Sequence, residues 1–156
     1  MAKADDHQKL QTAIFLHQKG NLNEAGKLYR ALIKTNPNNF HALHFLGVID
    51  AGAGNIEQAK LLMARSLSIR PPNIQFLENY AAVLFQSKDY KSALKACQEG
   101  LQLNNANAAL LYVSAISLFK LSNFQDAAAQ FDKLLLLQPN NISALNERGS
   151  VLAEIK

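Results

Sequence analysis

The sequence lacks a second cysteine, since Cys97 stands alone among 156 residues. A single cysteine excludes an internal disulfide and fits a reducing compartment, so we expect a cytoplasmic location. Long apolar runs are also missing: residues 108–113 form an uninterrupted run that is far too short to cross a bilayer, and residues 1–7 have no apolar core. We therefore predict a chain without a membrane partner.

Basic residues are not concentrated. The chain has 16 Lys and Arg against 12 Asp and Glu, a net charge of +4. Only Lys88, Lys91 and Lys95 follow one another along a predicted helix face. Nucleic-acid-binding surfaces normally carry a denser basic stripe, so we expect a solvated surface and no nucleic-acid partner.

Sequence motifs of catalytic, phosphate-binding and metal sites are absent as well. The sequence shows no Ser/His/Asp set, no glycine-rich phosphate loop, no metal motif and no carboxylate pair. We predict no catalytic residue, no cofactor and no enzyme activity within these residues. A longer parent chain could still be an enzyme.

What the sequence does contain is a period of 34 residues. Two columns illustrate it: Ala25, Ala59, Ala93 and Ala127 form one, and Asn39, Asn73, Asn107 and Asn141 form the other. A period of this size is typical of helical arrays. We predict one domain over residues 1–156, with repeats at 6–39, 40–73, 74–107 and 108–141 and a partial repeat at 142–156.

Each repeat is predicted to form a helix, a short turn and a second helix. Apolar spacing predicts helices over 6–18 and about 23–34 in the first repeat. Residues 36–39, Asn-Pro-Asn-Asn, end one repeat and offer an Asn cap to the next. The inner turns are Gly20-Asn21, Gly54-Asn55, Lys88-Asp89 and Ser122-Asn123. Their Asn or Asp is expected to cap the second helix and to tolerate an unusual backbone angle, and turns this short make the paired helices antiparallel.

Two columns of small residues predict where paired helices approach closely. The second helices contribute the alanine column above, and the first helices contribute Ala13, Gly47, Ala81, Ala115 and Gly149. Large apolar residues surround them, in columns that hold Leu43, Leu77, Leu111 and Leu145, and Tyr29, Met63, Cys97 and Phe131. Cys97 is therefore expected to be a buried hydrophobe and not a reactive thiol.

The period, the two small columns and Pro37, Pro71 and Pro139 near the repeat ends resemble the tetratricopeptide repeat. The resemblance covers four full repeats and the first helix of a fifth. It implies an all-α, right-handed superhelical solenoid whose first helices line a concave groove for a peptide or protein segment. Three residues depart from the pattern: Lys9, Asp50, and Asn105 where proline is expected.

Helical spacing selects the side chains that could face the groove. They lie opposite the small column of the first helices, and several are apolar, which favours a partner surface. The candidates are Leu10, Ile14, His41, His44, Phe45, Val48, Gln75, Glu78, Asn79, Phe85, Tyr112, Ile116 and Phe119. The same face carries His17, Ala82, Ala109 and Val113. For each large apolar residue the competing interpretation is a core contact between repeats.

Four histidines, His7, His17, His41 and His44, fall in the first two repeats. Simple surface histidines are favoured over a metal site, because no third ligand is evident beside His41 and His44. The cluster is expected to make this end of the groove sensitive to pH between about 6 and 7. Asp50 is expected to be solvated or paired with an arginine.

Two known groove chemistries fit poorly. Asn79 alone matches the Lys, Arg and Asn set by which tetratricopeptide modules grip a C-terminal carboxylate. The asparagine ladder of O-linked N-acetylglucosamine transferases, in the register Gln11, Phe45, Asn79, Val113 and Glu147, keeps one Asn. We favour a scaffold for protein–protein interaction; the alternative is the substrate-recruiting arm of a longer glycosyltransferase of this kind.

The last predicted helix, 142–155, has no second helix to cover it. Leu145, Leu152 and Ile155 are expected to be partly uncovered. Either the chain is cut from a longer array, which we favour, or a second copy covers this helix by self-association.

Overall fold

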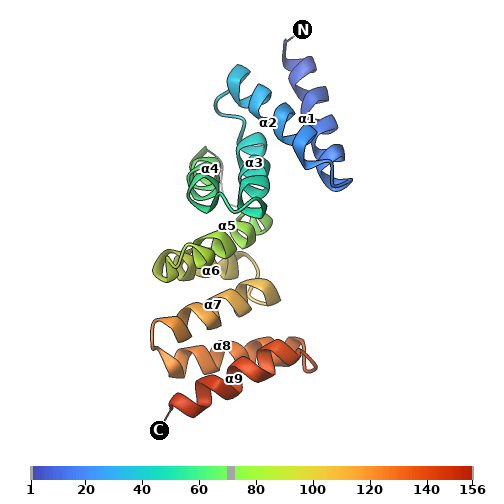
Figure 1. Ribbon diagram of the computed structural model, residues 1–156. Coiled ribbons are helices and arrows are strands. Elements are labelled where there is room, and N and C mark those ends of the chain that lie inside the picture. The colour runs from blue at the N-terminus through green and yellow to red at the C-terminus, as the bar shows by residue number, and fades with distance from the viewer. Residues whose placement is uncertain (1, 70–72, 156) are drawn as a thin grey trace. The chain divides into compact units, whose positions relative to one another are not determined.

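The computed structural model describes residues 2–69 and 73–155, with side chains from Asp5 onward (Figure 1). Within these ranges the chain forms nine α helices and no strand, which confirms the all-α prediction. Pro71, one of the expected repeat ends, lies outside the described residues. The helices are α1 Ala2–Gln18, α2 Leu22–Thr35, α3 Phe40–Gly52, α4 Ile56–Ile69, α5 Ile74–Gln86, α6 Tyr90–Leu103, α7 Ala108–Lys120, α8 Phe124–Leu137 and α9 Ile142–Glu154. The first helix begins at Ala2, earlier than predicted.

The helices pack as sequential antiparallel pairs in two compact units. Unit 1, residues 1–71, holds the pairs α1/α2 and α3/α4, and α3 also packs against α2. Unit 2, residues 72–156, holds α5/α6 and α7/α8, with α9 against α8. Within unit 2, α7 packs against both α6 and α8. The pairing follows the helix, turn, helix pattern of each repeat.

Asparagine side chains cap the first helix of each repeat from the second onward. The side-chain oxygens of Asn39 and Asn73 accept from the amides of Ala42 at 3.0 Å and Phe76 at 2.8 Å. Asn107 and Asn141 repeat this bond with Leu110 at 2.9 Å and Ala144 at 3.0 Å. These bonds confirm the predicted caps, each of which satisfies an otherwise unpaired amide at a helix start.

The inner turns differ from their prediction in one respect. The residue in the left-handed region is the first of each turn pair and not the Asn or Asp that follows it: φ is 80° at Gly20, 85° at Gly54, 61° at Lys88 and 60° at Ser122. Among the Asn and Asp residues, Asp89 caps its helix by accepting from the Ser92 amide at 3.2 Å. Asn21 and Asn123 make no side-chain cap bond. A glycine lowers the strain of a positive φ, which explains its place in the first two turns.

The small columns lie where the paired helices meet. Ala13, Ala81 and Ala115 of the first helices are fully buried, as are all four alanines of the second-helix column. A methyl group added at Gly47 would lie 2.8 Å from Met63 Cγ and 3.2 Å from the Ala59 carbonyl oxygen. The predicted close approach is therefore confirmed. Sequence patterns missed a second one, at Gly100, whose added methyl would meet the Leu110 side chain of α7.

The bulky columns fill each unit's core. Tyr29, Leu32 and Leu46 lie at the centre of unit 1, and Phe131 and Leu134 lie at the centre of unit 2. Cys97 is also fully buried, which confirms the expectation of a core cysteine, and burial raises the pKa of its thiol to about 12. The last repeat is the exception: Leu145 is 48% exposed, Leu152 is 43% exposed, and a methyl at Gly149 would meet nothing.

Gly47 and Gly149 occupy the same column, and their substitution should have opposite effects on stability. We expect Gly47→Ala to lower the free energy of unfolding by about 1–3 kcal/mol, because the added methyl overlaps α4. Gly149→Ala should raise it by up to about 1 kcal/mol, because alanine favours an exposed helix. Urea denaturation followed by circular dichroism measures both. Equal effects of the two substitutions would contradict the close approach.

Candidate functional site

In unit 1 the predicted face is built around Phe45 on α3. Its ring centroid lies 5.8 Å from those of His17 on α1 and Tyr29 on α2, and 6.3 Å from that of His41. Phe45 is half-buried and packs partly against the core. The structure therefore brings His41 and Phe45 together with His17, and it adds Tyr29, which the sequence assigned to the core.

The remaining unit 1 candidates divide into half-buried and buried residues. Leu10 and Ile14 are half-buried and pack against the core of the unit, and Val48 is half-buried as well. His44 is fully buried, so its place on an open face was predicted wrongly. It adjoins Phe45 in sequence, but the 100° turn per residue of an α helix directs it between the packed helices.

Burial changes the pKa of two histidines of this cluster. It lowers the pKa of His44 to about 4, with smaller contributions from the nearby His41 and His17, and it lowers the pKa of His17. A buried imidazole resists protonation because its charged form loses hydration. The charge of His44 therefore does not change between pH 6 and 7. Among the described side chains, no three or more His, Cys, Asp or Glu residues are grouped to hold a metal ion.

Asp50 lies at the C-terminal end of α3. Its carboxylate is buried, with Oδ1 4.0 Å from Nη2 of Arg30, and its backbone oxygen accepts from the Asn55 amide at 2.8 Å. The expected pairing with an arginine is confirmed. Asp50 is held inside unit 1 and is not solvated.

In unit 2 the polar candidates lie on α5. Gln75 is exposed and its side-chain amide donates to Glu78 at 3.3 Å. Glu78 also accepts a bond from the side-chain amide of Asn107, the cap of α7. The carboxylate thus supports the start of the next repeat. Asn79 and Phe85 are half-buried, and the Phe85 ring centroid lies 5.3 Å from that of Tyr90.

The candidates on α7 border an open cavity of about 520 Å³. Tyr112, Ala109 and Val113 form its α7 wall. Burial and the charge of Glu147 raise the pKa of Tyr112. Ile116 and Phe119 are half-buried and pack against the core of unit 2. The other wall comes from Gln138 and Asn141 between α8 and α9 and from Ser143 at the start of α9. Sequence reasoning missed these residues because only the tertiary fold brings them to α7.

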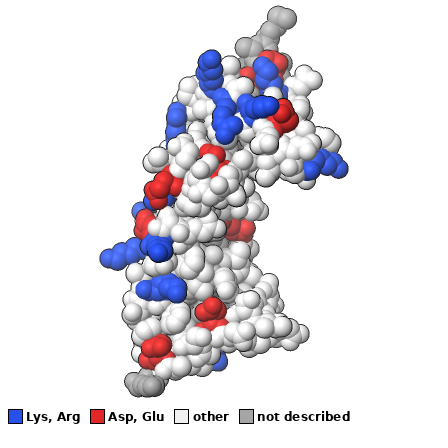
Figure 2. Space-filling model, in the orientation of Figure 1, with Lys and Arg blue, Asp and Glu red and all other residues white. Residues whose placement is uncertain are grey.

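Charged side chains are scattered over the face shown in Figure 2. Lys and Arg gather over α1 and α2, with Asp and Glu among them, and most of the remaining surface of that face is uncharged. No continuous basic stripe appears on it. None of the helices in the described ranges has the length and apolar character that crossing a bilayer requires.

Comparison with known proteins identifies the family. Residues 52–134 match the family described as anaphase-promoting complex, cyclosome, subunit 3, over more than half of the chain. The chain belongs to this family, whose repeats are tetratricopeptide repeats. The prediction of a tetratricopeptide-repeat protein is therefore confirmed.

Two curated relatives contain a similar stretch. The tetratricopeptide repeats are 28% identical over 104 residues to sperm-associated antigen 1 of Mus musculus, covering 67% of this chain and 11% of that protein. They are 21% identical over 128 residues to anaphase-promoting complex subunit 3 of Schizosaccharomyces pombe, covering 82% of this chain and 19% of that protein. The chain thus spans less than a fifth of the length of either relative.

Solved structures share the tetratricopeptide fold. One is YrrB, described as a tetratricopeptide-repeat protein with an unusual peptide-binding site; the TM-score is 0.87 at 19% identity, covering 93% of this chain and 75% of that one. A structure of the MamA protein gives a TM-score of 0.88 at 18% identity, covering 99% of this chain and 84% of that one. Identities this low show the fold alone.

The burial of His44 predicts a loss of stability in acid. Its pKa is about 6.5 in the unfolded chain and about 4 in the folded one, so the unfolded state binds more protons between these values. The contribution of neutral His44 to the free energy of unfolding is fully present above pH 6.5 and falls as the pH drops toward 4. From this residue alone we expect a loss of about 2 kcal/mol between pH 7.5 and 5.

Urea denaturation of the wild type, His44→Gln and His7→Gln across this pH range measures the effect. His7 is an exposed histidine on α1 and serves as the matched control. His44→Gln should flatten the pH dependence, whereas His7→Gln should keep it. An unchanged slope in His44→Gln would exclude His44 as its source.

Proposed function

We propose that this tetratricopeptide-repeat chain is a non-catalytic, cytoplasmic scaffold that binds a peptide or protein segment along its first helices. The candidate contact surfaces are the faces of the first helices, α1 and α3 in unit 1 and α5 and α7 in unit 2. No catalysis, nucleic acid or membrane enters this proposal.

The observation that carries the proposal is the cavity beside Tyr112. Its volume, about 520 Å³, suits one or two side chains of a bound segment. Tyr112 offers a half-buried aromatic face with its ring edge-to-face against the core residue Phe131, at 6.1 Å between centroids. An aromatic ring held by the core is a rigid anchor that loses little entropy on binding.

Unit 1 offers a second aromatic anchor. Phe45 is half-buried and its neighbours His17, His41 and Tyr29 hold it on several sides. The neutral state of buried His44 beneath it adds no charge to this face at neutral pH. Both anchors therefore favour apolar or aromatic side chains in the bound segment. The similarity to YrrB, which has a peptide-binding site, is consistent with this use of the fold.

The alternative is a substrate-recruiting arm of a longer enzyme. It rests on the asparagine-ladder register, in which Asn79 is the one match. In the structure Asn79 is half-buried, and no series of equivalent amides follows it. A scaffold is therefore the better-supported function.

The aromatic anchors can be tested with peptides selected from a displayed library on the intact protein. We expect Phe45→Ala and Tyr112→Ala each to weaken the affinity of such peptides by about tenfold or more, as removal of a buried aromatic contact does. Fluorescence anisotropy gives the dissociation constants, and circular dichroism checks that helix content is kept.

Phe15→Ala provides the control, because Phe15 is an exposed phenylalanine of α1 outside the predicted face. It should bind with wild-type affinity. If both anchor variants also kept wild-type affinity while folded, the segment would not bind along the first helices.

Self-association through the last helix is a separate proposal. In the last two helices, Ile142, Leu145 and Leu152 of α9 and Leu136 of α8 are exposed apolar residues. Around Gly149 on α9 there is open space, since an added methyl group would meet nothing within 4 Å. We infer that two copies can pair there, α9 against α9.

Light scattering over a range of concentrations tests this pairing. We expect the mean mass to rise with concentration, and Leu145→Lys with Leu152→Lys to abolish the rise by placing like charges in the contact. A wild-type protein that stays a strict monomer throughout the range would refute it.

A further inference from the structure

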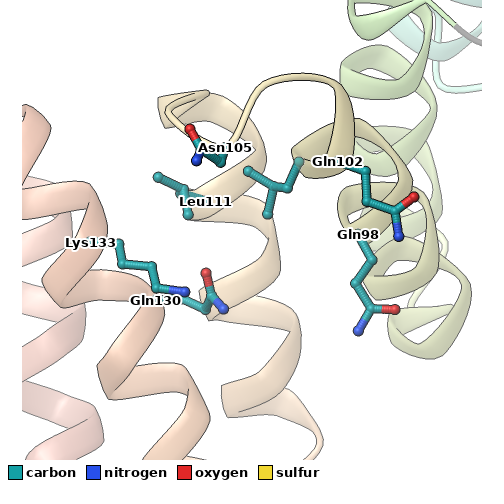
Figure 3. Close-up of a pocket in the computed structure, with 7 residues that line it drawn as sticks. Gln98, Gln102, Asn105, Leu111, Gln130 and Lys133 are labelled. Carbon is teal, nitrogen blue, oxygen red and sulfur yellow. The ribbon is translucent and has the colours of Figure 1, made fainter.

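A second groove lies in unit 2 between the outer helices α6 and α8. Both helices pack against α7, which forms the floor, and the cavity between them measures about 370 Å³ (Figure 3). It shares no lining residue with the cavity beside Tyr112. The groove is therefore a different surface from the one proposed for the first helices.

The floor of this groove is apolar. Leu111 of α7 is only 2% exposed, and Leu101 of α6 is half-buried and packs against the same core. Of the two, Leu101 keeps part of its side chain accessible and offers a shallow contact for an apolar side chain. Their positions are fixed by the core, so the floor exists before any ligand binds.

Primary amides form most of the walls. Gln98 and Gln102 project from α6, Asn105 follows it, and Gln130 stands opposite on α8, as Figure 3 shows. The Gln130 side-chain oxygen is buried and has no hydrogen-bond partner among the described residues. A buried acceptor without a donor is costly, so a ligand that brings an N–H group here would be favoured.

An amide side chain can donate and accept at once, as a peptide backbone does. A row of such side chains along a groove therefore matches the alternating N–H and C=O groups of an extended peptide. Asn105 belongs to this row and stands where the other repeats have Pro37, Pro71 and Pro139. Its departure from the repeat pattern places an amide in the groove in place of a ring that cannot donate.

Among the described residues that line the groove, the charged one is a lysine. Lys133 lines it, is exposed, and forms no ion pair within the described residues. The neighbouring carboxylate, Asp132, is bound to Arg148. On α6, Lys91 and Lys95 continue the helix stripe of Gln98 and Gln102, at helical spacings of three and four. Glu99 is the one acidic residue of that helix.

We propose that the groove between α6 and α8 binds an extended peptide carrying Asp or Glu side chains. The amides of Gln98, Gln102 and Gln130 bond its backbone, an apolar side chain rests on Leu101, and a carboxylate meets Lys133. The protein then holds two segments at once, an apolar one on its first helices and an acidic one on its second helices.

The probe for this site is a fluorescein-labelled peptide of alternating Glu and Leu, compared with the same peptide carrying Gln for Glu. We expect the intact protein to bind the Glu peptide saturably and more tightly than the Gln peptide, and added salt to weaken it. Lys133→Glu and Gln102→Leu should each weaken binding about tenfold. Both residues are exposed, so the substitutions leave the core intact.

Lys34→Glu on α2 is the matched control, an exposed lysine reversed in charge away from the groove, and should bind as the wild type does. The proposal fails if no saturable binding is seen, if the Gln peptide binds equally, or if Lys133→Glu has no effect. It also fails if Phe45→Ala with Tyr112→Ala abolishes binding, since the first helices would then hold the peptide. The proposal likewise fails if a labelled thymidine oligonucleotide binds with the affinity of the Glu peptide and with the same dependence on Lys133. The groove would then capture polyanions without specificity for a peptide.

Discussion

The close approach of paired helices at their small residues is the constraint on which this structure depends. Where Gly47 meets Ala59 and Met63, there is no space for a methyl group on α3. Alanines fill the equivalent positions of the other complete pairs and are fully buried. Helices this close exclude water from the bulky residues around the contact, so the packing energy of every repeat follows from it. Each repeat then needs a neighbour, because one helix pair alone cannot bury both of its faces.

The same contact decides which side chains remain available for binding. Once the small column of a first helix faces its partner, a step of one residue along the helix, about 100° around its axis, can separate a buried position from an accessible one. His44 and Phe45 show the consequence: the histidine is fully buried and neutral, whereas the phenylalanine remains half-exposed among other rings. At the last helix the partner contact is missing, and Leu145 and Gly149 stay open.

The two faces of unit 2 differ in chemistry although both derive from the same repeat. The first-helix side offers an aromatic ring and small residues, with Tyr112 beside a cavity. The second-helix side offers amides and a lysine over an apolar floor. The residues that build the repeat, namely the small columns and the asparagine caps, are shared by the repeats. Only residues outside these shared positions can therefore distinguish one bound segment from another. Asn105 and Lys133 are residues of this kind, since neither belongs to the small columns or the caps.

The sequence by itself determined the repeat, the helix pairs, the asparagine caps and the small columns, because each depends on contacts set by a fixed spacing along the chain. It also indicated the buried Cys97 and the uncovered last helix. Only the tertiary structure decided which residues of the candidate face are open. Helical spacing places His44 and Phe45 on one broad face, but the packing of the helices within unit 1 buries the first. The bond of Glu78 on α5 to Asn107 at the start of α7, the second wall of the Tyr112 cavity, and the groove between α6 and α8 each join residues of different structural elements. Such contacts depend on how helices lie in space, which no periodicity encodes.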